Sequence, residues 1–196
     1  MGEKKYLDKV SALFEKSPVV DYSSIERIVK DKNHHSLYAK QLVRNLILSG
    51  KIKRITKGYY TNKGNYQLII FCFKPSYFGL QDALSFHNIW EQETIPVILT
   101  TKKARSGIRK VFGKNIMIRR IDKKYLFGFD YFKDNQYFFP YSDIEKTLID
   151  LVYFRQKIDR ETLIEIKNKI NKEKLNLYLR KYPKQIKERV NLLISK

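Results

Sequence analysis

The sequence of 196 residues contains one cysteine, one tryptophan, five prolines and half as many acidic as basic residues. A single cysteine excludes an intramolecular disulfide framework and a zinc site built from cysteines. Cys72 stands inside the apolar run 68–73, so we expect it to be buried and unreactive. No apolar run approaches the roughly 18 residues of a membrane span, and residues 1–10 lack the apolar core of a signal peptide. We therefore expect a cytoplasmic protein that has no membrane partner.

The signatures of the common catalytic and cofactor sites are missing as well. There is no Walker loop, no GxSxG or GxGxxG motif, and no pair of histidines at metal-ligand spacing. The histidines of the polar turn 31–35 are better interpreted as phosphate contacts or exposed residues, and His87 as a hydrogen-bonded core residue. Asp143, Glu145 and Lys146 resemble a nuclease cluster superficially, but they stand at a capped helix start. We predict no enzyme activity, no catalytic residue, no cofactor and no metal ion.

Positive charge is abundant and clustered. The formal net charge is +20, while 43% hydrophobic and 14% aromatic residues exclude a disordered chain. The net charge by segment is +8 over 1–65, −2 over 66–100, +9 over 101–124, −3 over 125–154 and +8 over 155–196. Codon bias can explain many lysines but not their clustering. The charge alone favours a polyanionic partner, and it favours nucleic acid over an anionic membrane.

The first 64 residues are predicted to form a winged helix-turn-helix domain. Apolar spacing predicts a helix over 4–16, a second capped by Asp21 or Ser23, and a third over 36–49 that Gly50 ends. A hairpin with strands 52–55 and 59–61 follows the third helix. A helix followed directly by a basic hairpin is typical of a recognition helix and its wing, which bind duplex DNA.

The third helix and the hairpin carry the predicted DNA contacts. Seven of the 28 residues from 36 to 63 are Lys or Arg, and none is acidic. With positions 39, 42, 43 and 46 inward, the predicted contacts are Ser36, Tyr38, Lys40, Gln41, Arg44, Lys51, Lys53, Arg54, Lys57 and Tyr59. Arg and Lys can bind guanine and Gln can bind adenine in the major groove, whereas hairpin lysines suit phosphates or the minor groove. The alternative is a solvated helix face beside a basic hairpin.

Residues 65–196 are predicted to form a second, α+β domain that ends in helices. The expected elements are a strand or short buried helix over 66–73, a helix over 79–88, strands over 97–100, 116–121, 125–132 and 136–141, a capping box of Ser142 with Glu145, and helices over 159–170, 172–181 and 183–194. Residues 101–115 are expected to form a basic loop with a short turn. The fold class is therefore α+β.

The basic stretch 101–124 is a candidate for a second contact surface. The residues concerned are Lys102, Lys103, Arg105, Arg109, Lys110 and Lys114. They can bind DNA phosphates, dock an acidic partner protein, or form a plain solvated loop.

The pattern as a whole resembles the AbiEi-type antitoxins of type IV toxin–antitoxin (abortive infection) systems. The resemblance covers about residues 5–155 and lies in the wing sequence 57–60, the helical segment 77–87, the Pro-led strand 96–101, the strand 116–121 and the block 141–150. These motifs are moderately specific in combination. The extreme basicity of 101–124 and the acidic-poor tail depart from the family pattern.

The resemblance implies a DNA-binding transcriptional autorepressor that acts as an antitoxin. It would bind inverted repeats of double-stranded DNA in its own promoter and counteract a nucleotidyltransferase toxin without need of a stable complex. The family has no catalytic residues. Two alternatives stay open: a winged-helix regulator without a toxin partner, and an RNA- or protein-binding module that uses the winged helix as a scaffold.

Overall fold

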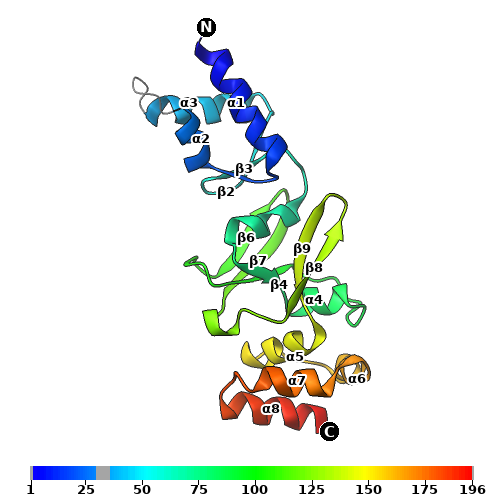
Figure 1. Ribbon diagram of the computed structural model, residues 1–196. Coiled ribbons are helices and arrows are strands. Elements are labelled where there is room, and N and C mark those ends of the chain that lie inside the picture. The colour runs from blue at the N-terminus through cyan, green and yellow to red at the C-terminus, as the bar shows by residue number, and fades with distance from the viewer. Residues whose placement is uncertain (1, 30–35, 196) are drawn as a thin grey trace. The chain divides into compact units, whose positions relative to one another are not determined.

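The computed structural model describes residues 2–29 and 36–195, so the turn predicted at 31–35 lies outside the described residues. The chain is a mixed α+β protein, as predicted, with a six-stranded sheet and a helical C-terminal part (Figure 1). It divides into two compact units. The first contains residues up to Cys72 together with Lys110–Lys114, and the second contains Phe73–Arg109 and Asn115–Lys196. No described helix has the length and apolar character needed to cross a membrane.

Over its described residues, the first unit contains three α-helices and a three-stranded antiparallel sheet, followed by most of a 3-10 helix. Its elements are α1 (Gly2–Lys16), β1 (Val20–Asp21), α2 (Tyr22–Val29), α3 (Ser36–Leu48), β2 (Lys53–Thr56) and β3 (Tyr59–Thr61), with strand order β1-β3-β2. Asp21 is the side chain that caps α2, because its carboxylate accepts a hydrogen bond from the backbone N of Ser24 at 2.6 Å. Strand β1 was not predicted, because a segment of two residues is too short to show a periodic pattern.

One apolar cluster holds these elements together. Val10 and Phe14 of α1, Ile25 of α2, and Leu42 and Leu46 of α3 are all buried in it. Their spacing of three or four residues places each set on one helix face, which is why each helix has a buried side.

A left-handed glycine ends α3 and turns the chain into the hairpin. Gly50 has φ of +70°, and the backbone N of Lys51 donates to the carbonyl of Leu46 at 3.0 Å. Glycine adopts this φ without a steric cost, so it closes the helix as predicted. The register between β2 and β3 then shifts between Arg54 and Thr56, and the intervening Ile55 is buried.

The segment after the hairpin is a helix rather than a strand. Tyr66–Phe73 forms the 3-10 helix η1, with Leu68, Ile69 and Ile70 fully buried. The short buried helix was one of the two predicted alternatives. Cys72 is buried, as expected.

The six-stranded sheet mixes parallel and antiparallel pairs, and most of its residues belong to the second unit, although Lys110, Val111 and Lys114 are grouped with the first. Its strands are β4 (Ser76–Phe78), β5 (Val97–Thr100), β6 (Gly107–Val111), β7 (Lys114–Arg120), β8 (Phe129–Asp134) and β9 (Tyr137–Ser142), in the order β6-β7-β5-β4-β9-β8. The pairs β4–β9 and β5–β7 are parallel, whereas β4–β5 and β8–β9 are antiparallel.

Several predicted elements of this region were wrong in type or extent. Part of the expected basic loop 101–115 is strand β6, which lies at the sheet edge, and its residues from Gly107 to Lys110 are half-buried or exposed. Strand β4 was missed because it has only three residues. The strand expected from 125 begins at Phe129, preceded by the 3-10 helix η2 (Lys123–Tyr125).

The helices of the second unit pack beside this sheet and against one another. They are α4 (Gln81–Phe86), α5 (Ile144–Tyr153), α6 (Arg160–Lys169), α7 (Lys172–Leu179) and α8 (Lys184–Ser195), and Figure 1 shows α5, α7 and α8 one after another. The core between sheet and helices includes Tyr77 and Leu99 from strands, Leu148 and Leu151 from α5, and Val190 from α8.

The predicted capping box at the start of α5 is wrong. Asp143 caps this helix, since its carboxylate accepts from the backbone N of Lys146 at 2.7 Å. Ser142 instead lies fully buried, with its hydroxyl 2.7 Å from that of Thr147. Glu145 accepts from the backbone N of Asn171 at 2.7 Å and so joins α5 to the start of α7.

Candidate nucleic-acid interface

Helix α3 has one buried face and one polar face. Ala39, Leu42, Val43 and Leu46 are buried, as predicted. Because the helix repeats every 3.6 residues, this burial turns the intervening polar positions to solvent. The exposed positions of this face are Lys40, Gln41, Arg44 and Asn45, flanked by Leu37 and Leu48.

Gln41 and Asn45 form a hydrogen-bonded pair on the exposed face. The Gln41 amide N donates to the Asn45 side-chain O at 2.9 Å, one helical turn away. This bond restrains the Gln41 side chain and leaves its carbonyl O and second N–H available. Those two groups match the adenine edge in the major groove. The sequence prediction omitted Asn45, although its spacing of four from Gln41 could have indicated it.

Helix α3 also exposes the large apolar side chains of Leu37, Leu48 and, to a smaller extent, Ile47. Leu37 is 71% exposed and Leu48 is 75% exposed. Exposed leucines on a polar helix face are candidates for contact with an apolar group, such as a thymine methyl in the major groove. The apolar pattern of the helix alone did not predict that Leu37 is exposed.

The hairpin presents four cations to solvent. Lys51, Lys53, Arg54 and Lys57 are all exposed. Gly58, with φ of +78°, forms the turn between β2 and β3, and its carbonyl accepts from the backbone N of Tyr22 at 2.8 Å. This hydrogen bond attaches the turn to the start of α2. It therefore fixes the position of the basic hairpin relative to the helices of the first unit.

The cations of α3 and the hairpin are not neutralised by carboxylates. Among the described residues, no Asp or Glu forms an ion pair with Lys40, Arg44, Lys51, Lys53, Arg54, Lys57 or Lys63. Uncompensated positive charge of this density attracts phosphates strongly.

The remaining predicted DNA contacts are not exposed side chains of the polar face. Two of them are half-buried, and the side chain of the third is not described. Tyr38 is half-buried and packs edge-on against Tyr6, with ring centroids 5.9 Å apart. Tyr59 is also half-buried, in β3 opposite Asp21. Ser36 begins α3, but its side chain lies outside the described part of the structure. Two predicted contacts, Tyr38 and Tyr59, thus help to pack the unit.

The six cations proposed as a second surface are divided between the two units. Lys110 and Lys114 belong to the first, and Lys102, Lys103, Arg105 and Arg109 belong to the second. The Arg109 guanidinium donates to the carbonyls of Arg105 and Ile108 at 2.7 and 3.1 Å. That side chain therefore supports the bend before β6.

A buried polar cluster lies in the second unit, where sequence reasoning found only a superficial nuclease pattern. Lys146 and Asp150 are fully buried and form an ion pair on α5. The Tyr77 hydroxyl donates to Asp150 at 2.7 Å and accepts from Lys146 at 2.8 Å. Burial lowers the pKa of the Lys146 ammonium and raises that of Asp150, while their mutual attraction opposes both shifts. The three groups bind one another and connect β4 to α5.

Comparison with known proteins gives a structural relationship only. No protein family model and no curated protein matches the chain. Among solved structures, the chain is similar to the RV2827C protein from Mycobacterium tuberculosis, with a TM-score of 0.58 and 12% sequence identity. The match covers 97% of this chain and 76% of that chain. At this identity the likeness concerns the fold, and it includes both units.

Proposed function

We propose that this chain is a sequence-specific DNA-binding regulator whose first unit is a winged helix-turn-helix. In this proposal α3 enters the major groove, and the β2–β3 hairpin is the wing that follows the phosphates. The observation that carries the proposal is the combination of an exposed polar face on α3 with the cations of the adjoining hairpin, none of them ion-paired to a described carboxylate.

The geometry of the exposed face favours duplex DNA as the partner. The amide pair of Gln41 and Asn45 has free groups that suit an adenine edge, and Arg44 suits guanine. The deep, narrow major groove of an RNA helix would not admit α3 in this way. The alternative of an RNA- or protein-binding module that uses this unit as a scaffold would require another surface for its partner.

The resemblance to AbiEi-type antitoxins extends the proposal to a biological role. The chain would repress its own promoter at inverted repeats and counteract a nucleotidyltransferase toxin encoded beside it, in the cytoplasm. The residues that support this role are the segments 77–87, 96–101 and 141–150 in addition to the wing. The alternative within the same class is a regulator of this architecture without a toxin partner.

A mobility-shift titration tests the DNA-binding part. The full chain is titrated against the DNA upstream of its own reading frame and against random duplex of equal length, over a series of salt concentrations. We expect tighter binding to the upstream DNA and a steep loss of affinity with salt, since phosphate contacts release counterions. Equal affinity for both duplexes would refute a sequence-specific regulator.

The antitoxin role has a separate test. The neighbouring reading frame, if it encodes a nucleotidyltransferase, is expressed with and without this chain, and growth is measured. Rescue of growth is expected. A neighbouring nucleotidyltransferase whose toxicity persists with this chain present would contradict the role.

A further inference from the structure

Strand β8 forms one edge of the six-stranded sheet, and among the described strands only β9 lies beside it (Figure 1). It runs over six residues and pairs with β9 in continuous register, without a bulge. Its residues from Asp130 to Asp134 are all exposed. Proteins protect exposed sheet edges with bulges, prolines, very short strands or charged side chains. Strand β8 has neither a bulge nor a proline, so only its charged side chains could oppose another strand.

The alternation of hydrogen bonds along β8 determines which backbone groups face outward. Just before the strand, the carbonyl of Gly128 accepts a hydrogen bond from the backbone N of Asp143 at 3.0 Å. Because bonded and non-bonded pairs alternate in an antiparallel ladder, the even-numbered residues of β8 bond to β9. The N–H and C=O groups of Phe129, Tyr131 and Lys133 therefore point away from β9. Within the described residues, no hydrogen bond from outside the sheet reaches these groups.

The outward groups of β8 are arranged symmetrically about Tyr131. An identical strand, related by a two-fold axis perpendicular to the sheet, can therefore pair with β8 in the antiparallel sense. Tyr131 then lies opposite Tyr131 of the second copy, and Phe129 lies opposite Lys133 on each side of the axis. The outward groups of the two strands meet in about six backbone hydrogen bonds. The edge is thus complementary to a second copy of itself.

Charge favours this register over the neighbouring ones. An axis at Asp130 would place Asp130 opposite Asp130 of the second copy, and an axis at Phe132 would place Asp130 opposite Asp134. Like charges directly opposite one another destabilise a strand pair. With the axis at Tyr131, no carboxylate lies directly opposite another. The Lys133 ammonium instead lies beside the Phe129 ring of the second copy, where a cation is attracted to the aromatic face.

The charge of the β8–β9 hairpin also distinguishes a second copy from nucleic acid as the occupant of this edge. The hairpin carries Asp130, Asp134 and Lys133, a net charge of −1, in a chain of net charge +20. Two copies repel each other over most of their surface but not at this hairpin, and a polyanion gains no attraction there. At the opposite edge of the sheet β6 carries Arg109 and Lys110, so repulsion opposes self-pairing at that edge.

Two exposed aromatic rings lie beside the open edge. Tyr131 is 62% exposed, and Phe138 of β9 is 54% exposed. Phe138 lies opposite Lys133, two residues from Tyr131, so both rings lie on the same face of the hairpin. Apolar surface next to an unpaired strand favours association with another strand. Pairing about the axis brings the two Tyr131 side chains together and covers part of this surface.

We propose that two copies of this chain associate through β8, in an antiparallel pair centred on Tyr131 that joins their sheets into one. The association uses only the second unit, so it is independent of the DNA contacts proposed for α3. A pair of short strands buries less than the roughly 800 Å² per partner of standard interfaces. We therefore expect a reversible dimer with a Kd on the order of 10 μM.

Cysteine cross-linking of the full chain tests the partner and the register together. Residues that face each other at the axis have Cα atoms about 5.5 Å apart, which suits a disulfide, so Y131C should form a covalent dimer under mild oxidation. K133C is the matched control, because the Lys133 residues of the two copies lie roughly 13 Å apart along the strand. Both variants retain the buried Cys72. Equal cross-linking of the two variants, or none with Y131C, would overturn the proposal.

Sedimentation velocity over a series of concentrations gives a second test. The wild type should change from monomer to dimer as the concentration rises. Y131P removes an N–H that β9 does not use, and edge strands tolerate proline, so this variant should stay folded by circular dichroism and lose dimer affinity by at least about tenfold. Y131T keeps the N–H and should lose less.

Two results of the sedimentation experiment would contradict the proposal. A wild type that stays monomeric at every concentration would leave this edge to a strand of another protein. A folded Y131P that dimerises as the wild type does would place the interface elsewhere. The cross-linking of Y131C provides the decision if Y131P does not fold, because cysteine leaves the backbone of β8 intact.

Discussion

Lys146 and Asp150, one helical turn apart on α5, form an ion pair from which solvent is fully excluded. Tyr77 of β4 bridges the two groups, so the pair also connects the central region of the sheet to the helical layer. Each charge depends on its hydrogen-bonded partners for stabilisation, because both side chains are fully excluded from solvent. The cluster is therefore more sensitive to the loss of one member than to the loss of the charged pair together.

Replacing Lys146 with Met leaves Asp150 buried without a cation. We expect the free energy of unfolding of the second unit to fall by about 3–5 kcal/mol, as measured by urea denaturation. K146M/D150L removes both charges and should recover a substantial part of this loss. The single variant D150L completes the comparison. If the losses of K146M and D150L simply add in K146M/D150L, the two residues are not coupled as described.

Asp82 should make stability depend on pH. Its Oδ2 is buried without a hydrogen-bond partner among the described residues, and burial raises its pKa to about 7, against an opposing hydrogen bond from the Val97 backbone. The folded state therefore holds this proton more tightly than the unfolded state, whose pKa is 3.8. Stability from this group is fully present below the unfolded pKa and is lost as pH rises through about 7.

The variant D82N should lose this dependence. We expect its free energy of unfolding to change less between about pH 5 and pH 8 than that of the wild type, and to exceed the wild-type value at the higher pH. The amide has nearly the same shape as the carboxyl group, so it can keep the hydrogen bond from Val97. Identical pH profiles for the two proteins would contradict the assignment to Asp82.

Gly128 should not tolerate a side chain. Its φ is +69°, and a Cβ there would lie 2.9 Å from both the Cβ of Lys146 and a ring carbon of Tyr178. G128A combines backbone strain with this clash, so we expect a loss of stability greater than the roughly 1 kcal/mol of the backbone term alone. G50A is the matched control, since Gly50 has φ of +70° and a Cβ added to it would meet no other atom within 4 Å. Melting temperatures of the two variants should differ, with G128A lower.

If the proposed DNA binding is correct, specific and general DNA contacts should be separable by mutation in the first unit. Q41A should cost about 1–3 kcal/mol in binding to the upstream DNA and relax the preference at one position. N45A should reproduce part of that effect, because it releases the Gln41 side chain. K57A should instead weaken all duplexes about equally and lower the salt slope by about 1. Mobility shifts on a set of single-base operator variants distinguish these patterns, and equal effects of Q41A and K57A would argue against base contact by Gln41.

Local patterns were sufficient to predict most helices from the sequence. The inward face of α3 and its end at Gly50 follow from the spacing of apolar residues within one helix and from one glycine. The same holds for the alternating residues of β7. By contrast, β1 and β4 are held by partners distant in the chain, and their two or three residues carry no periodicity.

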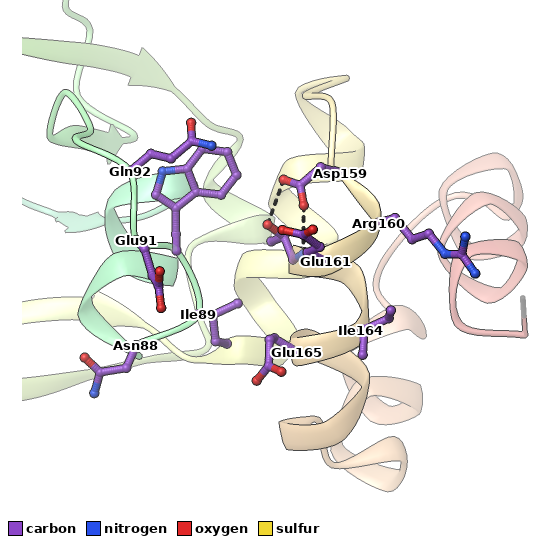
Figure 2. A pocket seen from close by; sticks show the side chains of 11 residues that line it. Asn88, Ile89, Glu91, Gln92, Asp159, Arg160, Glu161, Ile164 and Glu165 are labelled. Carbon is purple, nitrogen blue, oxygen red and sulfur yellow. Dashed lines mark hydrogen bonds between the residues drawn. The ribbon is translucent and has the colours of Figure 1, made fainter.

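The sequence predicted which types of residue are exposed at the candidate interface, but it did not predict their side-chain contacts. Exposed cations on α3 and the hairpin follow from composition and helical period, but the bond between Gln41 and Asn45 depends on side-chain conformation. Packing against Tyr6 placed Tyr38 partly in the core. The cavity between Asn88–Gln92 and the start of α6 joins residues near 90 with residues near 160, which are far apart in the sequence (Figure 2).

The parallel pairing of Phe78 with Tyr141 also bears on synthesis of the chain. During translation β4 leaves the ribosome more than sixty residues before its neighbour β9. Until β9 arrives, one side of β4 has unpaired backbone groups and the apolar sheet face lacks α5. A ribosome that stalls or ends translation before Tyr137 would release a sheet with an open, aggregation-prone edge.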